Sequence, residues 1–243
     1  MKKIILTFLL SGLVISSAYS QAALIVLILG DKVATEQFHL SVDAAANLAT
    51  YPGLDGSKIG AGVNFGLGTH IKLGEKWHLK PEFKPLSHKG TRGVASITEV
   101  PAELTVEGNK LKLYYIDIPV FLQYSVNDNL YLSAGPQVSF LTNAYQYSSG
   151  TLADGTESTI RIKTKNSFKG VSFSFPVEAG FSLHLANERS TTSMDINIFV
   201  RYEYGFTDVF SDPALGSSNI SMFQVGASLP FVKTADELAK SKK

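Results

Sequence analysis

The segment from Gly170 to Leu183 alternates without a break between apolar and polar side chains. Its apolar members are Val171, Phe173, Phe175, Val177, Ala179, Phe181 and Leu183. Successive side chains of a β-strand point to opposite faces, so this segment has one apolar face and one polar face. It is longer than the roughly five or six residues of an ordinary globular strand. It reaches the about nine to eleven residues that a tilted strand needs to cross a bilayer.

The same alternation recurs along the chain and predicts eight strands. They cover residues 38–48, 59–71, 77–86, 112–124, 130–144, 170–183, 194–206 and 223–231. A water-soluble β-sandwich also alternates, but these segments are longer and more regular, and their polar faces carry formal charges in mid-strand. Strands that face lipid must close into a ring, because only helices and closed barrels satisfy every backbone hydrogen bond in a membrane. Prolines within the segments are expected at bulges or strand ends, because proline cannot donate to the sheet.

The links between the segments alternate in length. They lie at 74–75, 127–129 and 186–191 (short), at 50–57 (moderate), and at 89–108, 147–167 and 207–217 (long). Outer-membrane barrels have short periplasmic turns and long outer loops. The sequence therefore predicts an all-β fold, a transmembrane antiparallel up-and-down β-barrel of eight strands over residues 37–231. We expect it in the cell outer membrane with both termini periplasmic. A barrel of ten strands is the alternative, if a long loop folds into the wall.

The first twenty residues have the features of a secretory signal peptide, with two lysines, an apolar centre and a small-x-small site at 18–20. Residues 21–36 form the predicted mature N-terminal segment. Its apolar run at 22–29 either packs against the barrel or a partner, or extends the signal region as an anchor. Residues 232–243 form a polar, lysine-rich tail, expected in the periplasm.

The formal charge is only +1, without blocks of like charge, so nucleic acid is not an expected partner. The absence of cysteine excludes disulfides and thiolate metal sites.

The last predicted strand carries a short pattern that resembles the signal read by the barrel-assembly machinery. It consists of Gln224, Gly226, Leu229 and Phe231. We therefore expect that machinery as a partner during biogenesis, together with outer-membrane lipid. Aromatic residues are expected at both membrane interfaces. On the periplasmic side these are Phe38, Trp77, Tyr124 and Phe231, and on the outer side Tyr51, Tyr114, Tyr204 and Phe206.

Two segments of the chain together resemble the PorT-like outer-membrane β-barrel family. They are LKLYYIDIPVFLQY at residues 111–124 and LYLSAGPQV at residues 130–138. That family has a similar strand with a Tyr-x-acid-x-Pro pattern, followed by one with Ala-Gly-Pro. Residues 30–33 ahead of the first strand are also similar. The resemblance implies a Gram-negative outer membrane and, for the best-known member, a part in type IX secretion. It implies no catalytic residues.

Sorting charged residues by strand parity predicts a polar network inside the barrel. Its members are Asp43, Lys80, Glu82, Lys84, Asp117, Glu178, Asp195, Arg201 and Glu203. An unpaired charge in a low-dielectric interior is costly, so these groups are expected to form ion pairs that fill the lumen. The alternative is a narrow passage that prefers cations, or a site for a small polar ligand.

No catalytic, cofactor or metal site is expected. Glu178, Ser182 and His184 share a face, as in lipid deacylases, but His184 should lie at the periplasmic end, away from the outer leaflet. The other histidines on the inner face are expected to fill space through hydrogen bonds. The long loops form either a solvated cap or a binding surface, and alternation at 159–165 predicts a hairpin above the membrane.

The sequence thus favours a non-enzymatic barrel with a filled lumen and a structural, secretion-accessory or surface-binding role. A partner protein of the envelope or of a secretion system is possible in each of these roles. A small channel for cations or polar solutes is the alternative, and a lipid-modifying enzyme is the third.

Overall fold

The computed structural model describes residue 35 and residues 37–185, 194–212 and 215–231. The expected signal peptide at 1–20, the apolar run at 22–29 and the tail at 232–243 lie outside the described residues. Within the described ranges, no helix has the length and apolar character needed to cross a membrane. A short 3-10 turn, η2, covers Lys165–Ser167.

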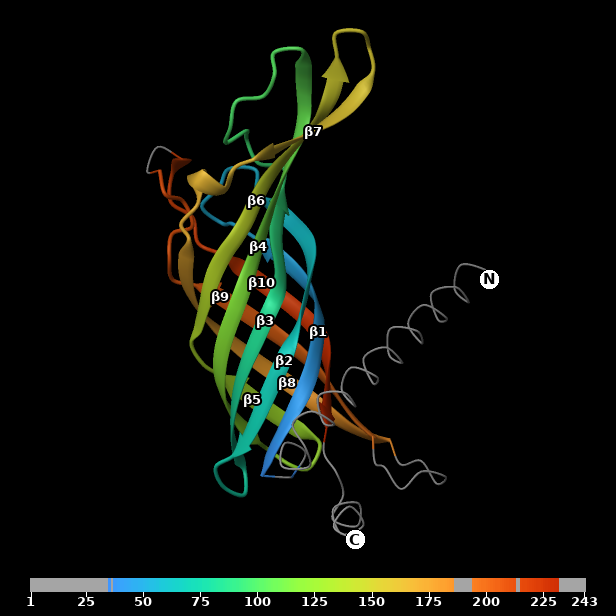
Figure 1. The fold of residues 1–243 in the computed structure, drawn as a ribbon, viewed down its shortest axis with the longest axis vertical. Helices are drawn as coiled ribbons and strands as arrows, with labels where there is room; N and C mark the ends of the chain where they lie inside the picture. The colour runs from blue at the N-terminus through green and yellow to red at the C-terminus, as the bar shows by residue number, and fades with distance from the viewer. Residues whose placement is uncertain (1–34, 36, 186–193, 213–214, 232–243) are drawn as a thin grey trace, which may run out of the picture.

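The described strands form one antiparallel sheet (Figure 1). They are β1 Phe38–Thr50, β2 Lys58–Lys72, β3 Trp77–Arg92, β4 Leu104–Ser125, β5 Leu130–Ala134, β6 Gln137–Leu152, β7 Glu157–Lys163, β8 Val171–Leu185, β9 Met194–Gly205 and β10 Ser221–Phe231. The long connections, with β7, lie at one end, called the loop end below. The turns from β2 to β3 and from β4 to β5 lie at the other, the turn end.

The sheet closes on itself, because the first strand pairs with the last. β1 and β10 pair from Leu40 opposite Phe231 to Thr50 opposite Ser221. β5 and β6 succeed one another in a single position between β4 and β8, and β7 pairs only with β6. Nine of the ten strands therefore occupy eight positions around the ring, and β7 lies beyond it, which confirms the predicted eight-stranded up-and-down barrel.

The prediction of one continuous strand over residues 130–144 is wrong. The strand is interrupted at Gly135 and Pro136. On the turn-end side of the break β5 pairs with β4, and on the loop-end side β6 pairs with β4. Pro136 has no N–H for the sheet, although its carbonyl still accepts a hydrogen bond from the Val120 amide at 2.9 Å. Gly135 is required here because a β-carbon would collide with the Val120 backbone. A second irregularity, opposite Tyr114 and Tyr115, shifts the parity of β6.

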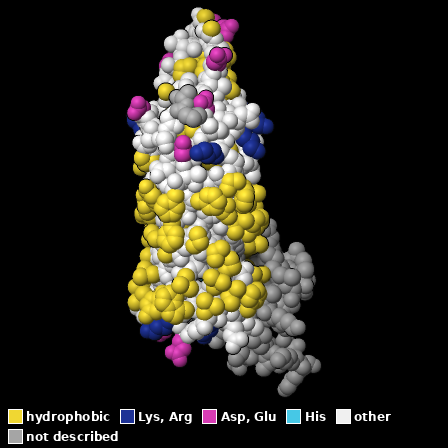
Figure 2. All heavy atoms as spheres, turned by 90° about the vertical axis from the view of Figure 1, so that its left-hand side faces the viewer, with side chains coloured by type: hydrophobic (Ala, Val, Ile, Leu, Met, Phe, Trp, Pro, Cys, Tyr) yellow, Lys and Arg dark blue, Asp and Glu magenta, His cyan; other side chains and the backbone are white. Residues whose placement is uncertain are grey.

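The outer wall of the barrel is apolar in a broad band between the two ends (Figure 2). On β8, Phe173 is 57% exposed on this wall, whereas its neighbour Ser174 is 5% exposed and faces the lumen. Trp77 and Tyr124 pack with ring centroids 4.8 Å apart at the turn end, and Tyr204 and Phe206 at 5.5 Å toward the loop end. Side chains that would be buried in a soluble protein thus face outward, as lipid contact requires.

Apolar side chains also fill the inside of the barrel near the loop end, in a cluster called the apolar cap. Its members are Ala49, Tyr51, Val94, Leu111, Leu113, Tyr115, Leu141, Ala144, Phe168, Val209, Phe210, Ile220 and Met222. The expectation that Tyr51 belongs to the interfacial belt is wrong, because its side chain is 1% exposed within this cap. Tyr51 follows the last residue of β1, and the chain there turns inward over the lumen.

Three strands continue beyond the ring at the loop end as a projecting sheet (Figure 1). β4 pairs with β6 as far as Leu104 opposite Leu152, and β6 pairs with β7 as far as Thr151 opposite Glu157. This confirms the hairpin predicted from the alternation at 159–165. The predicted loops at 89–108 and 147–167 are correspondingly shorter, because β3, β4, β6 and β7 extend into them.

Candidate functional site

The lumen is the part of the barrel in which charged side chains converge. Eight of the nine predicted network residues are at most 4% exposed, which are Asp43, Lys80, Glu82, Lys84, Asp117, Glu178, Arg201 and Glu203. Asp195 differs, because it is only half-buried and lies one register step from the turn-end edge of β9, opposite His184. The structure therefore places Asp195 at the rim and not among the buried ion pairs.

Lys89 is a buried lumen residue that parity counting placed in a loop. The register between β3 and β4 shifts between Lys84 and Ser87, so Pro85 and Leu86 both face outward. This bulge reverses the parity of the rest of β3 and turns Lys89 inward, where it is 1% exposed. Pro85 is the residue in the sequence that could have indicated this bulge, since proline within a strand commonly marks one.

Five charged side chains form a central cluster around Arg201. Its guanidinium donates to both oxygens of Glu82, at 3.1 Å from Nη1 and 2.9 Å from Nη2, and its Nε donates to Glu178 at 2.8 Å. Lys80 lies 2.9 Å from Glu82 and 3.7 Å from Glu178. Lys84 lies 2.9 Å from the other oxygen of Glu82. Bidentate, charge-assisted contacts of this kind fix geometry as well as energy, so these residues tie β3, β8 and β9 together across the lumen.

A second cluster lies closer to the loop end around Lys89. Its ammonium group lies 2.8 Å from Glu203 and 3.1 Å from Asp117. Hydroxyl groups complete the shell, because Ser174 donates to Glu203 at 3.0 Å and Lys89 donates to Ser139 at 3.3 Å. The second cluster therefore joins β3, β4, β6, β8 and β9, and it consists of one cation and two carboxylates.

Neutral amides connect Glu203 on β9 to the next strands around the ring, which are β10, β1 and β2. Gln224 donates to Glu203 at 3.5 Å and accepts a hydrogen bond from Asn64 at 3.0 Å. Asn64 also donates to Asn47 at 3.0 Å, and Asn47 donates to the carbonyl of His88 at 2.9 Å. Gln224, predicted as part of an assembly signal, is therefore also a lumen residue, only 1% exposed.

Aromatic rings pack against the central cluster. The Arg201 guanidinium lies 4.4 Å from the ring centroid of Phe121 and 4.9 Å from that of Phe199. Gly226 makes room for Phe199, because a β-carbon at this position would lie 2.5 Å from the ring. Such stacking of a desolvated cation on aromatic faces adds to the ion pairs. Parity counting did not single out these two phenylalanines, since it sorted charges alone.

The histidines at the turn end are packed within the lumen. His39 and His70 stack with ring centroids 4.5 Å apart, and His70 shares a hydrogen bond of 3.2 Å with Ser41, which donates to Asp43 at 3.1 Å. Among the described residues, no group of His, Asp and Glu could hold a metal ion. In the set Glu178, Ser182 and His184, Glu178 is engaged by Arg201, and the side chain of His184 lies outside what the structure describes.

The charges in the buried lumen nearly balance. Five carboxylates, at Asp43, Glu82, Asp117, Glu178 and Glu203, face four cations, at Lys80, Lys84, Lys89 and Arg201. Acidic groups still outnumber basic ones, as the sequence predicted, but the excess falls from six against three to five against four, because Lys89 is inside and Asp195 is at the rim. Four of the carboxylates lie within 4 Å of a buried cation, whereas Asp43 accepts from Ser41 and forms no ion pair among the described residues. Pairing of this kind is typical of a filling network, since an open cation pathway would leave most carboxylates without protein partners.

Comparison with protein families matches residues 37–211 to the outer membrane protein beta-barrel domain. The chain belongs to the outer membrane protein beta-barrel domain family. This family assignment covers more than half of the 243 residues and, with the apolar band around the wall, it locates the barrel in the outer membrane. Comparison with curated proteins found no match.

Several solved structures resemble this outer-membrane barrel. Ail, the attachment invasion locus protein of Yersinia pestis, has 14% sequence identity and a TM-score of 0.43, covering 81% of this chain and all of that one. Neisserial surface protein A has 15% identity and a TM-score of 0.38, covering 80% and 97% of the two chains. OprG from Pseudomonas aeruginosa has 14% identity and a TM-score of 0.36, covering 79% and 96%.

Proposed function

We propose that this chain is a non-enzymatic, non-conducting outer-membrane barrel that presents a rigid sheet to the cell exterior for binding a partner. The observation that carries the proposal is that the lumen is filled at successive levels. Ion pairs fill its middle and the apolar cap fills its outer part. A filled barrel has no path for solute, so its exposed surfaces are the part available for function.

A small channel is the alternative, and two features oppose it. Arg201, Lys80 and Lys84 contact Glu82 from three directions, so a passing ion would have to displace a buried, hydrogen-bonded cation. Beyond them, water would have to enter the apolar cap between Leu113, Tyr115 and Met222, which are at most 3% exposed. Both barriers are costly, because buried charges need partners and apolar constrictions exclude water.

The projecting sheet is the surface best suited to a partner. In the described part of the chain β7 pairs only with β6, which leaves the other edge of β7 free to receive an added strand. The sheet is held firmly, because the loop at 93–103 is pinned to it. The Ile97 amide donates to Gln146 at 2.9 Å, and Asn109 donates to the Val94 carbonyl at 3.2 Å. A structural or PorT-like secretion-accessory role would use the same rigid body.

The proposed orientation puts both termini in the periplasm and the projecting sheet outside. It is supported by the rule that outer-membrane barrels have short periplasmic turns and long outer loops. The chain contains no cysteine, so single cysteines report on sidedness without background. T159C on β7 should react with a membrane-impermeant maleimide on whole cells. E75C at the turn end should react only after the outer membrane is permeabilised. The reverse pattern would refute the orientation.

Planar-bilayer recording of the purified full chain tests the closed lumen. We expect no single-channel steps from protein whose heat-modifiable migration shows that it is folded. Steady, reproducible steps from folded protein would refute the proposal and favour the channel. To separate the two non-channel roles, the secreted proteins of a deletion strain should be unchanged for a surface-binding barrel and depleted for a secretion accessory.

A further inference from the structure

Three adjacent strands carry a row of exposed cations near the loop end. In the register of the sheet, Arg92 on β3 lies directly opposite Lys58 on β2 and also opposite Lys110 on β4. Like charges in directly opposed positions destabilise a sheet. Among the described residues, none of the three forms an ion pair. The described part of the chain therefore supplies no ion-pair partner for this row.

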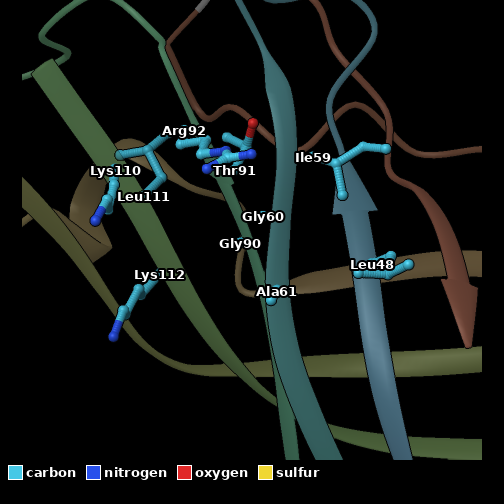
Figure 3. A pocket seen from close by; sticks show the side chains of 10 residues that line it. All are labelled: Leu48, Ile59, Gly60, Ala61, Gly90, Thr91, Arg92, Lys110, Leu111 and Lys112. Atoms are coloured by element: carbon cyan, nitrogen blue, oxygen red, sulfur yellow. The ribbon is translucent and has the colours of Figure 1, made fainter.

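A hollow of about 390 Å³ adjoins this row on the membrane side (Figure 3). Its floor includes Ala61 and Gly90, whose small size leaves the wall indented. Leu48 and Ile59 border it, and they are 43% and 54% exposed. Lys112 lines the hollow opposite Gly90, and its ammonium group lies 5.0 Å from the ring centroid of Tyr147, so a fourth cation borders the hollow on β4. Its volume lies within the range of ligand pockets, about 300–1,000 Å³.

We propose that this hollow and the row Lys58–Arg92–Lys110 bind a bis-phosphorylated, acylated glycolipid of the outer leaflet. An acyl chain would lie against Leu48 and Ile59 over the small residues, continuous with the lipid around the barrel. The phosphates would lie among Arg92, Lys110, Lys112 and Lys58. An anion there converts a repulsive row into a set of charge-assisted contacts.

The width of the row favours two phosphates over one. Neighbouring strands are about 4.8 Å apart, so the backbones that carry Lys58 and Lys110 are separated by about 10 Å. Side chains that extend straight out from such a row hold their charges farther apart than one phosphate spans, so two phosphates on one headgroup match the row better than one. Figure 3 shows the basic side chains of Arg92, Lys110 and Lys112 on one side of the hollow and the apolar Leu48 and Ile59 on the other. The inference goes beyond the proposed function, because it needs neither a closed lumen nor a protein partner.

Native mass spectrometry of the folded full chain in detergent tests the site, with lipid A as the probe. We expect one lipid A to bind, and R92Q/K110Q to weaken binding about tenfold or more, which corresponds to about 1.4 kcal/mol. K72Q, an exposed cation at the opposite end of β2, is the matched control and should bind normally. The wild type should bind monophosphoryl lipid A more weakly than lipid A. Monophosphoryl lipid A should bind to the wild type and to R92Q/K110Q with the same affinity.

A second variant tests the hollow separately from the charge. A61F fills the floor from an outward-facing position and leaves every cation in place, so it should weaken lipid A binding severalfold. Equal binding of lipid A by the wild type and R92Q/K110Q would overturn the proposal, as would unchanged binding by A61F. Phosphatidylglycerol that binds as tightly as lipid A, with the same loss in R92Q/K110Q, would overturn the assignment to a glycolipid. Heat-modifiable migration confirms that each variant is folded.

Discussion

Arg201 donates two parallel hydrogen bonds to Glu82 across the lumen, although the two residues are separated by 119 positions in the sequence. They lie on β9 and β3, which are not neighbours in the sheet. The contact therefore braces the ring through its centre, in addition to the hydrogen bonds that run around its wall. Arg201 also holds Glu178 on β8, so one guanidinium joins three strands.

Replacement of this guanidinium should strongly destabilise the barrel. R201M leaves Glu178 with Lys80 at 3.7 Å and the Ser133 hydroxyl at 3.5 Å as its remaining partners. Loss of one member of a buried charge pair costs about 3–5 kcal/mol. Urea unfolding in phospholipid vesicles measures the change in the free energy of unfolding. E178Q/R201M should recover part of the loss, because it also removes the unpaired carboxylate. Wild-type stability of R201M would show that the network does not brace the ring.

Truncation inside the apolar cap should cost more than the same truncation on the outer wall. Leu113 is fully buried in the cap, whereas Leu122 on the same strand is 45% exposed on the lipid-facing wall. L113A leaves a cavity and should lower the free energy of unfolding by about 2–5 kcal/mol. L122A should cost less, since lipid refills the space. Similar losses from both variants, measured in the same vesicles, would contradict a packed cap.

The glycine of the predicted assembly signal has a packing role that can be tested without the assembly machinery. In G226A the new methyl group would lie 2.5 Å from the Phe199 ring and 2.6 Å from the β-carbon of Ala45. Overpacking of this kind costs about 1–3 kcal/mol, so spontaneous refolding into vesicles should give a less stable barrel. L229A tests the other half of the signal. If G226A impairs assembly only in cells and refolds normally in vesicles, recognition and not packing explains the glycine.

One loop-end carboxylate should make the connection between β9 and β10 sensitive to acid. Partial burial raises the pKa of Asp208, but hydrogen bonds from the amides of Ser218 at 3.0 Å and Phe210 at 3.2 Å outweigh it, so the pKa is below its usual value. The stabilisation is therefore complete above the unfolded pKa, about 3.9, and is lost as the pH falls through the lower folded value.

Amide hydrogen exchange at Phe210 and Ser218 measures this transition. Both amides should stay protected at neutral pH and exchange faster in acid, after correction for the intrinsic rate. D208N carries no ionisable group there, so its protection should not change across the same pH range. Equal pH dependence in D208N and the wild type would assign the transition to another group.

The loop at 93–103 should be released from the projecting sheet by one substitution. Gln146 is fully buried, accepts from the Ile97 amide at 2.9 Å and donates to Ser148 at 2.9 Å. Q146A leaves the Ile97 amide without its acceptor, so we expect its hydrogen exchange to accelerate by about fivefold, since a net hydrogen bond contributes about 1 kcal/mol. Q123A, a buried lumen glutamine at the other end of the ring, should leave this exchange unchanged. Unchanged protection in Q146A would show that other contacts hold the loop.

Alternation of side chains is a local property, and it was sufficient to predict the barrel. Strict period-two segments such as 170–183 specify which residues face lipid, because each strand must present one apolar face to the bilayer. The same argument placed Glu82, Glu178 and Arg201 in the lumen. It could not place Lys89, because the bulge at Pro85 and Leu86 depends on how β3 fits β4. Tyr51 and the break at Gly135–Pro136 were mispredicted for a similar reason, since the chain there follows the shape of neighbouring strands.

The class of fold, the number of positions in the ring and the face of most strands follow from the period and length of each segment, so they can be deduced from the amino-acid order. Three features emerge only once the chain is folded: which charges meet, that the outer lumen is closed by apolar side chains, and that Lys58, Arg92 and Lys110 form one row. The physical reason is that partners across a barrel lie on strands far apart in the chain. Their meeting depends on register, bulges and ring closure, and no short segment encodes these.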